Sequence, residues 1–323
     1  MGAAGSRVER VLAGDVPALA QLMRDLDDGL PAGRDDLRTL YPHTGRAFVV
    51  GITGSPGVGK STVVDGLITR YRAAGRRVGV VAIDPSSPFS GGAILGDRIR
   101  MQRHATDAGV FIRSLATRGQ VGGLTRSTAD LVAVLDAAGY AVILVETVGV
   151  GQAEIDVVTT TDAAVVITAP GLGDEVQALK AGILEIADVL VVNKADREGA
   201  DRAMKDLSTM LDLRRQSALP SVPLLSVVAT TGQGMDALRS AIDGVQARPA
   251  EARGARRRQQ AEAQLLAVVT DITRAALQAG VAGDKAAATG KPGSVAALVD
   301  DIAARRTDPY TAARALLSAG MLR

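Results

Sequence analysis

The sequence predicts a three-layer α/β domain with a mainly parallel sheet, flanked by helical extensions at both ends. Short runs of β-branched apolar residues alternate with helical stretches over most of the chain. Continuous apolar strands separated by helices are typical of a parallel sheet that is covered on both faces. With 323 residues, 47% of them hydrophobic, the chain is long enough for a large core and about two domains.

Residues 1–45 are expected to form an N-terminal helical extension. Apolar residues recur at helical spacing from Val16 to Leu26, and Asp15 stands where a helix cap is expected. The central domain is expected over residues 46–247. Its seven predicted strands are 47–53, 78–84, 110–116, 141–147, 163–169, 188–193 and 223–229.

Residues 248–323 are expected to form a C-terminal helical arm. An arginine-rich segment, 253–258, leads into an Ala-rich helical stretch over 261–280, a loop over 281–293 and two further helices. The arginine run favours a solvated helical face. Contact with a phosphate or an acidic partner is the alternative.

Scarce residue types exclude several kinds of chemistry. The chain has no Cys, which rules out disulfides, thiolate metal sites and cysteine nucleophiles, and its two His are too few for a multi-histidine metal site. Seven aromatic residues and a net charge of +2 argue against a nucleic-acid partner. Because no apolar run approaches the roughly 18 residues of a membrane span and no signal peptide is evident, we expect a cytoplasmic protein.

A phosphate-binding loop follows the first predicted strand. The segment fits the pattern G-x-x-x-x-G-K-[ST] between a strand and a helix, and consists of Gly54, Ser55, Pro56, Gly57, Val58, Gly59, Lys60, Ser61 and Thr62. Glycines let successive backbone N–H groups face phosphate oxygens. We expect Lys60 to reach the β- and γ-phosphates and the Ser61 hydroxyl to bind Mg²⁺.

A second motif selects the base. The sixth predicted strand ends in Asn193, Lys194, Ala195 and Asp196, the N-K-x-D pattern, and Asn193 is the sole Asn of the chain. An ionised Asp196 can accept hydrogen bonds from guanine N1–H and the exocyclic N2 amino group, donors that adenine lacks at those positions. Lys194 is expected to cover the base with its stem while Asn193 braces the loop. The bound nucleotides are therefore expected to be GTP and GDP.

Two weaker signals complete the predicted nucleotide site. Val228, Ala229 and Thr230 follow the last strand, where a second base-contacting loop belongs, although an ordinary turn fits equally well. Glu146 and Gly149 resemble a D-x-x-G motif with Glu in place of Asp. In this interpretation Glu146 holds Mg²⁺ through a water molecule, and the Gly149 N–H bonds to the γ-phosphate. Asp84 and Asp97 are the other candidate carboxylates on the metal side.

Taken together, these segments resemble the GTPase chaperones of adenosylcobalamin-dependent methylmalonyl-CoA mutase, a family also called arginine/ornithine transport-system kinases. The likeness is densest over residues 46–235 and carries AIDPSSPFSGGAILGDRIRM, VETVGVGQAE and PGLGDEVQALKAGILEIADVLVVNKAD. The resemblance implies a P-loop GTPase that gates cofactor loading into the mutase and protects it from inactivation. It also implies a homodimer formed through the C-terminal arm.

The same resemblance assigns mobile segments. It places Asp97 in the first switch, Glu146 and Gly149 in the second, and Lys180 in a third segment, 173–182. Lys60, Asp97, Glu146 and Lys180 are then the candidate catalytic residues, although a helix-surface role for Lys180 is at least as well supported.

The sequence departs from common GTPase patterns in the catalytic water site. No Gln directly follows Gly149, and Gln152 lies three positions further on, so slow, partner-dependent hydrolysis is expected. Two alternatives stay open: a nucleotide-dependent kinase of an arginine/ornithine transport system, and a scaffold that GTP stabilises without turnover.

Overall fold

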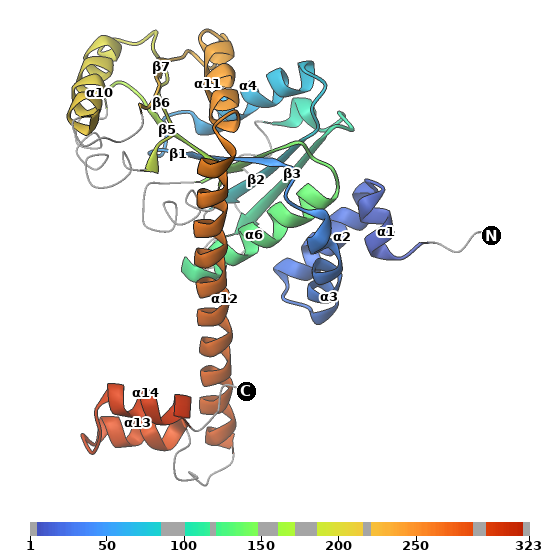
Figure 1. The fold of residues 1–323 in the computed structure, drawn as a ribbon, viewed down its shortest axis with the longest axis vertical. Coiled ribbons are helices and arrows are strands. Elements are labelled where there is room, and N and C mark those ends of the chain that lie inside the picture. Colours follow the sequence, from blue (N-terminus) through green and yellow to red (C-terminus); the bar gives the residue numbers. More distant parts are fainter. Residues whose placement is uncertain are drawn as a thin grey trace. The chain divides into compact units, whose positions relative to one another are not determined.

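A single seven-stranded sheet forms the centre of the chain (Figure 1). The computed structural model describes residues 5–84, 101–116, 121–147, 161–171, 186–215, 221–286 and 295–318. All the strand pairs are parallel, in the order β3-β2-β4-β1-β5-β6-β7. The strands are β1 (Phe48–Thr53), β2 (Val78–Asp84), β3 (Val110–Ala116), β4 (Val142–Glu146), β5 (Ala163–Thr168), β6 (Val189–Val192) and β7 (Leu224–Ser226). The predicted seven strands and the three-layer class are confirmed.

Helices cover both faces of this sheet. On one face α4 (Lys60–Ala73) and α11 (Met235–Gln246) pack against β1, β4 and β5, and their apolar side chains share a core with Val165 and Ile167. On the other face lie α6 (Val121–Ala137) and α10 (Ala200–Arg215). Neighbouring strand residues alternate between the two cores, as Val165 and Val166 do, because successive side chains point to opposite faces.

The N-terminal extension is helical, as predicted. It consists of α1 (Arg7–Leu12), α2 (Val16–Asp27) and α3 (Pro31–Leu40), which are followed by the 3₁₀ turn η1 (Tyr41–His43). Asp15 caps α2 by accepting a hydrogen bond from the Ala18 N–H at 2.8 Å. Leu19, Leu22 and Met23 are fully buried in the core that these helices share with α6.

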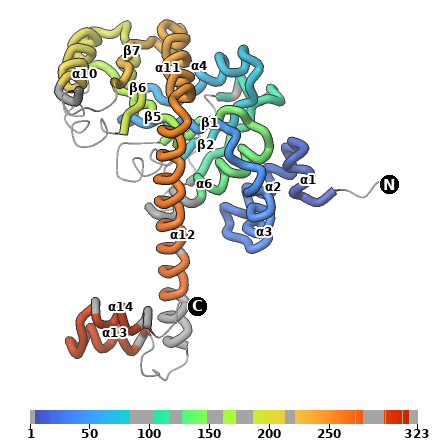
Figure 2. Tube along the Cα trace, viewed as in Figure 1, coloured from blue at the N-terminus to red at the C-terminus, as the bar shows by residue number. Residues whose placement is uncertain are grey.

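The C-terminal part begins with one long helix. α12 (Ala250–Ala286) is followed by α13 (Val295–Ala303) and α14 (Pro309–Ser318), and the last two lie side by side (Figure 2). The loop expected over 281–293 is wrong for 281–286, which are helical. Gly280 and Gly283 weakened the helical prediction, since each costs about 1 kcal/mol in a helix, but Ala and Lys neighbours are strong helix formers.

The chain divides into two compact units, Met1–Gln264 and Leu265–Arg323. The predicted domain limits at residues 45 and 247 stay a prediction. None of the helices in the described part of the chain has the length and apolar character needed to cross a membrane.

Candidate functional site

The predicted nucleotide motifs meet at one edge of the sheet. β1 ends at Thr53 and leads into the phosphate-binding loop, β4 ends at Glu146, and β6 ends just before Asn193. Because all the strands run parallel, their carboxyl ends lie at the same edge, where open α/β sheets bind ligands. The topology therefore brings together residues that are more than 100 positions apart in the sequence.

Glycine is required at two places in the phosphate-binding loop. Gly54 and Gly59 have positive φ angles, 148° and 95°. A Cβ on Gly54 would lie 2.1 Å from the Ile167 carbonyl oxygen, and a Cβ on Gly59 would lie 2.5 Å from the Asn193 Nδ2. These positions accept no side chain without a shift of the backbone or of the base-reading loop.

Lys60 begins α4 and turns back into the loop. Its side chain is buried, and its Nζ donates to the carbonyl oxygens of Gly54 at 2.7 Å and Ser55 at 3.0 Å. These bonds hold the ammonium group within the loop that precedes the helix. A compact point charge at this position is suited to phosphate oxygens.

Ser61 and Glu146 form the candidate metal site. The Ser61 Oγ donates to the Glu146 Oε1 at 2.6 Å, and both residues are buried. A hydroxyl and a carboxylate are the oxygen ligands that Mg²⁺ prefers, so these residues fit the predicted ion. Asp84 ends β2, two residues beyond Ala82, the register partner of Glu146.

The remaining predicted residues near the γ-phosphate cannot be placed. Asp97, Gly149 and Lys180 lie outside the described residues, as does the segment 173–182. Within the described part of the chain, no group of three acidic or histidine side chains is arranged to hold a metal ion.

Asn193 joins the phosphate-binding loop to the two base-reading loops. Its Nδ2 donates to the Val58 carbonyl oxygen at 2.8 Å, and its Oδ1 accepts from the Ala229 N–H at 3.1 Å. The side chain is 3% exposed, so both amide bonds form away from solvent. These two hydrogen bonds connect the loop after β6 to the phosphate-binding loop and to Ala229 of the weakly predicted loop.

Lys194 adopts a left-handed backbone conformation with φ 57°, which is uncommon for a residue with a side chain. This conformation directs its Nζ to the Gly57 carbonyl oxygen at 2.5 Å. Asp196 is exposed, and no described residue donates to its carboxylate. The carboxylate is therefore available to accept hydrogen bonds from a base.

The loop after β7 closes on itself. Val228 pairs with Gln233 through an N–H bond of 3.0 Å to the Gln233 carbonyl, and Thr230 at its tip is exposed. This short hairpin-like turn keeps the backbone next to Asn193. The geometry allows contacts from the backbone of this loop to a base.

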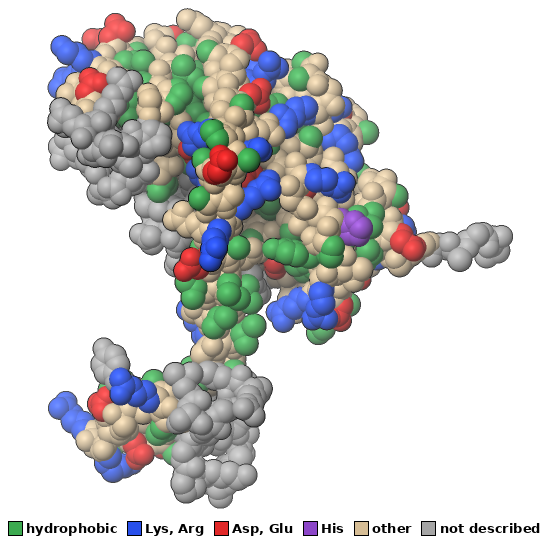
Figure 3. All heavy atoms as spheres, in the orientation of Figure 1, with side chains coloured by type: hydrophobic (Ala, Val, Ile, Leu, Met, Phe, Trp, Pro, Cys, Tyr) green, Lys and Arg blue, Asp and Glu red, His purple; other side chains and the backbone are tan. Residues whose placement is uncertain are grey.

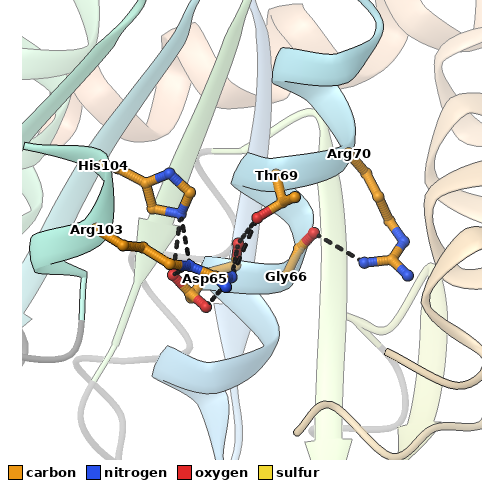
Figure 4. Close-up of polar contacts among 6 residues, drawn as sticks. All are labelled: Asp65, Gly66, Thr69, Arg70, Arg103 and His104. Atoms are coloured by element: carbon orange, nitrogen blue, oxygen red, sulfur yellow. Dashed lines mark hydrogen bonds and ion pairs between the residues drawn. The ribbon is translucent and has the colours of Figure 1, made fainter. Parts of the chain in front are cut away.

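A cluster on α4 lay outside the sequence predictions. Arg103 and His104, in the 3₁₀ turn η2 (Gln102–His104), both point to Asp65 (Figure 4). The His104 Nε2 lies 2.9 Å and the Arg103 Nε 2.6 Å from the Asp65 Oδ1, and Arg103 also donates to Thr69. These contacts attach the chain that follows Asp97 to the helix that carries Lys60. The scarcity of His is the sequence signal that could have singled out His104.

Comparisons with known proteins identify the family of this chain. Residues 19–282 match the family model described as methylmalonyl Co-A mutase-associated GTPase MeaB. A putative GTPase of Pyrococcus abyssi is 46% identical over 96% of this chain and 94% of its own length. The GTPase ArgK of Escherichia coli is 38% identical over 58% of each chain.

A mouse protein and a solved structure extend the comparison. The mouse methylmalonic aciduria type A homolog, a mitochondrial protein, is 39% identical over 58% of this chain and 46% of its own. The crystal structure of an LAO/AO transport system kinase has the same fold, with a TM-score of 0.68 over 97% of this chain and 95% of that one, at 24% identity. The chain belongs to the MeaB family of P-loop GTPases.

Proposed function

We propose that the chain is a Mg²⁺-dependent GTP switch that acts as a chaperone for adenosylcobalamin-dependent methylmalonyl-CoA mutase. The observation that carries the nucleotide assignment is Asn193, whose buried amide bonds to both Val58 and Ala229. One side chain thus links phosphate binding to base reading. A structural turn with no ligand would not require that link.

Each described residue then has a defined task. The Lys60 ammonium contacts the β- and γ-phosphates, and Asp196 accepts from guanine. Ser61 and Glu146 hold Mg²⁺, which when bound adds positive charge at the phosphate oxygens. Asp84 and Asp97 are further candidates on the metal side.

The switch is proposed to follow the γ-phosphate. The Gly149 N–H bonds to that phosphate, so that hydrolysis releases the segment after Glu146. Lys180 adds positive charge in the transition state when the segment 173–182 closes. Because no water-orienting Gln directly follows Gly149, intrinsic hydrolysis is slow and a partner completes the site.

The mutase is proposed as that partner because the matching family model is described as mutase-associated. We expect GTP hydrolysis to rise by about tenfold or more when the mutase from the same genome is added, since partners that complete a GTPase site act on this scale or above. The measurement is phosphate release at saturating GTP, with and without the mutase.

Three outcomes separate the candidate functions. Unchanged turnover together with no nucleotide-dependent complex would contradict the chaperone function. Phosphate transfer to a small acceptor would instead favour the kinase alternative. Stable GTP binding without any turnover, even with the mutase present, would favour the scaffold.

The C-terminal arm is proposed to form a homodimer. Leu265, Leu266, Val269 and Ile272 on α12 are 50–64% exposed, and Figure 3 shows hydrophobic side chains gathered on this helix. Leu265, Val269 and Ile272 follow the i, i+4, i+7 spacing of a helix face that packs on a partner. A second copy of the chain offers the same apolar face and would cover it symmetrically.

Charge on this face is expected to dissociate the dimer. We expect Leu265→Glu combined with Ile272→Glu to yield a monomer in sedimentation velocity, because two carboxylates would lose water in the interface. Ala263→Glu adds one carboxylate on the other side of the helix and should leave the dimer intact. A monomeric parent protein, or equal dissociation by Ala263→Glu, would contradict the proposal.

A further inference from the structure

A cavity lies at the other end of the sheet from the nucleotide site. It has a volume of about 280 Å³ and is formed by residues before β1, Asp162 before β5, the end of α11 and the start of α12. β1 begins at Phe48 beside this cavity and ends at the phosphate-binding loop. All of its lining residues belong to the unit Met1–Gln264. The cavity is therefore separate from the GTP site and complete within one unit.

Four arginines line this cavity, and one of them is already neutralised. Arg256 donates to the Asp188 Oδ2 at 2.7 Å and to the Thr161 carbonyl oxygen at 2.9 Å. Asp188 is buried and also accepts from Arg248. Arg256 is thus fixed in place, contrary to the prediction that the whole arginine run forms a solvated face.

The other three guanidinium groups have no carboxylate partner among the described residues. Arg46 donates to the His43 carbonyl oxygen at 3.0 Å, and Arg257 to the Gly45 carbonyl oxygen at 3.2 Å. No described residue accepts a hydrogen bond from the Arg253 side chain. Since a guanidinium has five N–H donors, most of the donors at this cavity stay available.

Among the described residues that line the cavity, the one carboxylate is that of Asp162, and it offsets this charge incompletely. Asp162 accepts from the Val49 N–H at 2.9 Å. Burial, the largest effect, raises the pKa of the Asp162 carboxyl, whereas Arg256 and Arg257 lower it. Asp136, which accepts from the backbone N–H groups of Gly45, Arg46 and Ala47, also raises that pKa. Three arginines without a carboxylate partner among the described residues thus outnumber these two carboxylates.

The arrangement of charges favours an anionic ligand. Arg253 and Arg257 are four residues apart on α12, a spacing at which like charges destabilise a helix. A multiply charged anion between them would relieve that repulsion, and guanidinium forks match phosphoryl oxygens in geometry. Phe48 is 5% exposed, so the cavity offers no aromatic face for a nucleic-acid base.

We propose that this cavity binds the phosphoryl or pyrophosphoryl group of a small molecule. Arg253 and Arg257 supply the ligand contacts from α12, and Arg46 supplies them from the loop before β1. The bound anion then connects the first turns of α12 to the amino end of β1, the strand that leads into the GTP site. The proposal does not depend on the identity of the GTPase's partner.

Binding of inorganic pyrophosphate to the full chain tests the proposal. The chain is first saturated with GDP and excess Mg²⁺, so that the phosphate-binding loop is filled, and heat of binding is then measured by titration calorimetry. We expect Arg253→Gln and Arg257→Gln each to weaken pyrophosphate binding about tenfold, as for the loss of one charge-assisted hydrogen bond. Arg258→Gln, an exposed arginine of the same run outside the cavity, is the matched control and should bind normally.

A reverse variant separates ligand contact from a structural effect. Asp162→Asn removes the opposing charge while its amide oxygen can still accept from Val49, and it should tighten pyrophosphate binding. Absence of binding to the parent chain would overturn the proposal. Equal weakening by Arg258→Gln, or binding that depends on Lys60 instead, would also overturn it.

Discussion

Replacing Lys60 with alanine is expected to reduce GTP turnover by about 10²–10³-fold, the scale seen when one preorganised hydrogen-bond donor is removed from an active site. The effect follows from the position of the Lys60 ammonium group. Lys60 is buried, and its Nζ is held by the Gly54 and Ser55 carbonyl oxygens, so truncation to alanine removes the positive charge from the phosphate-binding loop. The measurement is phosphate release at saturating GTP.

The control for this variant is Lys205→Ala. Lys205 is exposed on α10, and its removal should leave turnover unchanged. Lys60→Arg should also fail, because a planar guanidinium does not fit a cradle shaped for a compact ammonium. Retained hydrolysis in Lys60→Ala, with an unaltered unfolding temperature, would remove Lys60 from its proposed role.

The strands could be predicted from the sequence because each contains a short apolar run, although the run at 223–229 holds only the three-residue strand β7, Leu224–Ser226. The run at 163–169 became β5, Ala163–Thr168, and the one at 78–84 became β2 without a change of limits. Prediction was weaker where packing decides the structure. Residues 281–286 continue α12 in spite of two nearby glycines, and nothing local in the sequence shows this.

The site could be predicted where its chemistry is carried by adjacent residues. The Lys60 and Asn193 motifs each occupy a few consecutive positions, and the structure places them together. By contrast, Asp136 lies at the end of α6 and accepts from the N–H groups of Gly45 at 2.5 Å and Ala47 at 2.9 Å, about 90 residues away in the chain. A single buried carboxylate that holds a distant loop leaves no pattern in the sequence.

The arginine run shows the same limit. Its composition alone favoured a solvated face, yet Arg256 pairs with buried Asp188 while Arg258 stays exposed. Neighbouring residues of one type have different environments because a helix turns by about 100° per residue. Only the partner Asp188, which directly precedes β6, distinguishes them, and tertiary structure brings that partner to Arg256.

Asp196→Asn is expected to lower GTP affinity by about 10³-fold or more. A binding site built around hydrogen bonds loses affinity on this scale when a ligand donor no longer meets an acceptor. The exposed carboxylate has no partner in the described part of the chain and is therefore available for the guanine N1–H and N2 amino donors. The side-chain NH₂ group of an asparagine would face the guanine N1–H. Two donors would then meet, and no hydrogen bond could form between them. Xanthine carries an acceptor at C2, so the variant should prefer xanthosine triphosphate.

Glu198→Gln is the matched control for this change of base preference. Glu198 is exposed two residues further along the same loop, and loss of its charge should leave both affinities unaltered. Affinities for the two triphosphates are measured by competition against a fluorescent GDP. If GTP affinity were unchanged in Asp196→Asn, the base-reading role of Asp196 would be wrong. An equal loss of affinity for both triphosphates would point to loop distortion. Only a direct contact between Asp196 and the base would change the preference from GTP to xanthosine triphosphate.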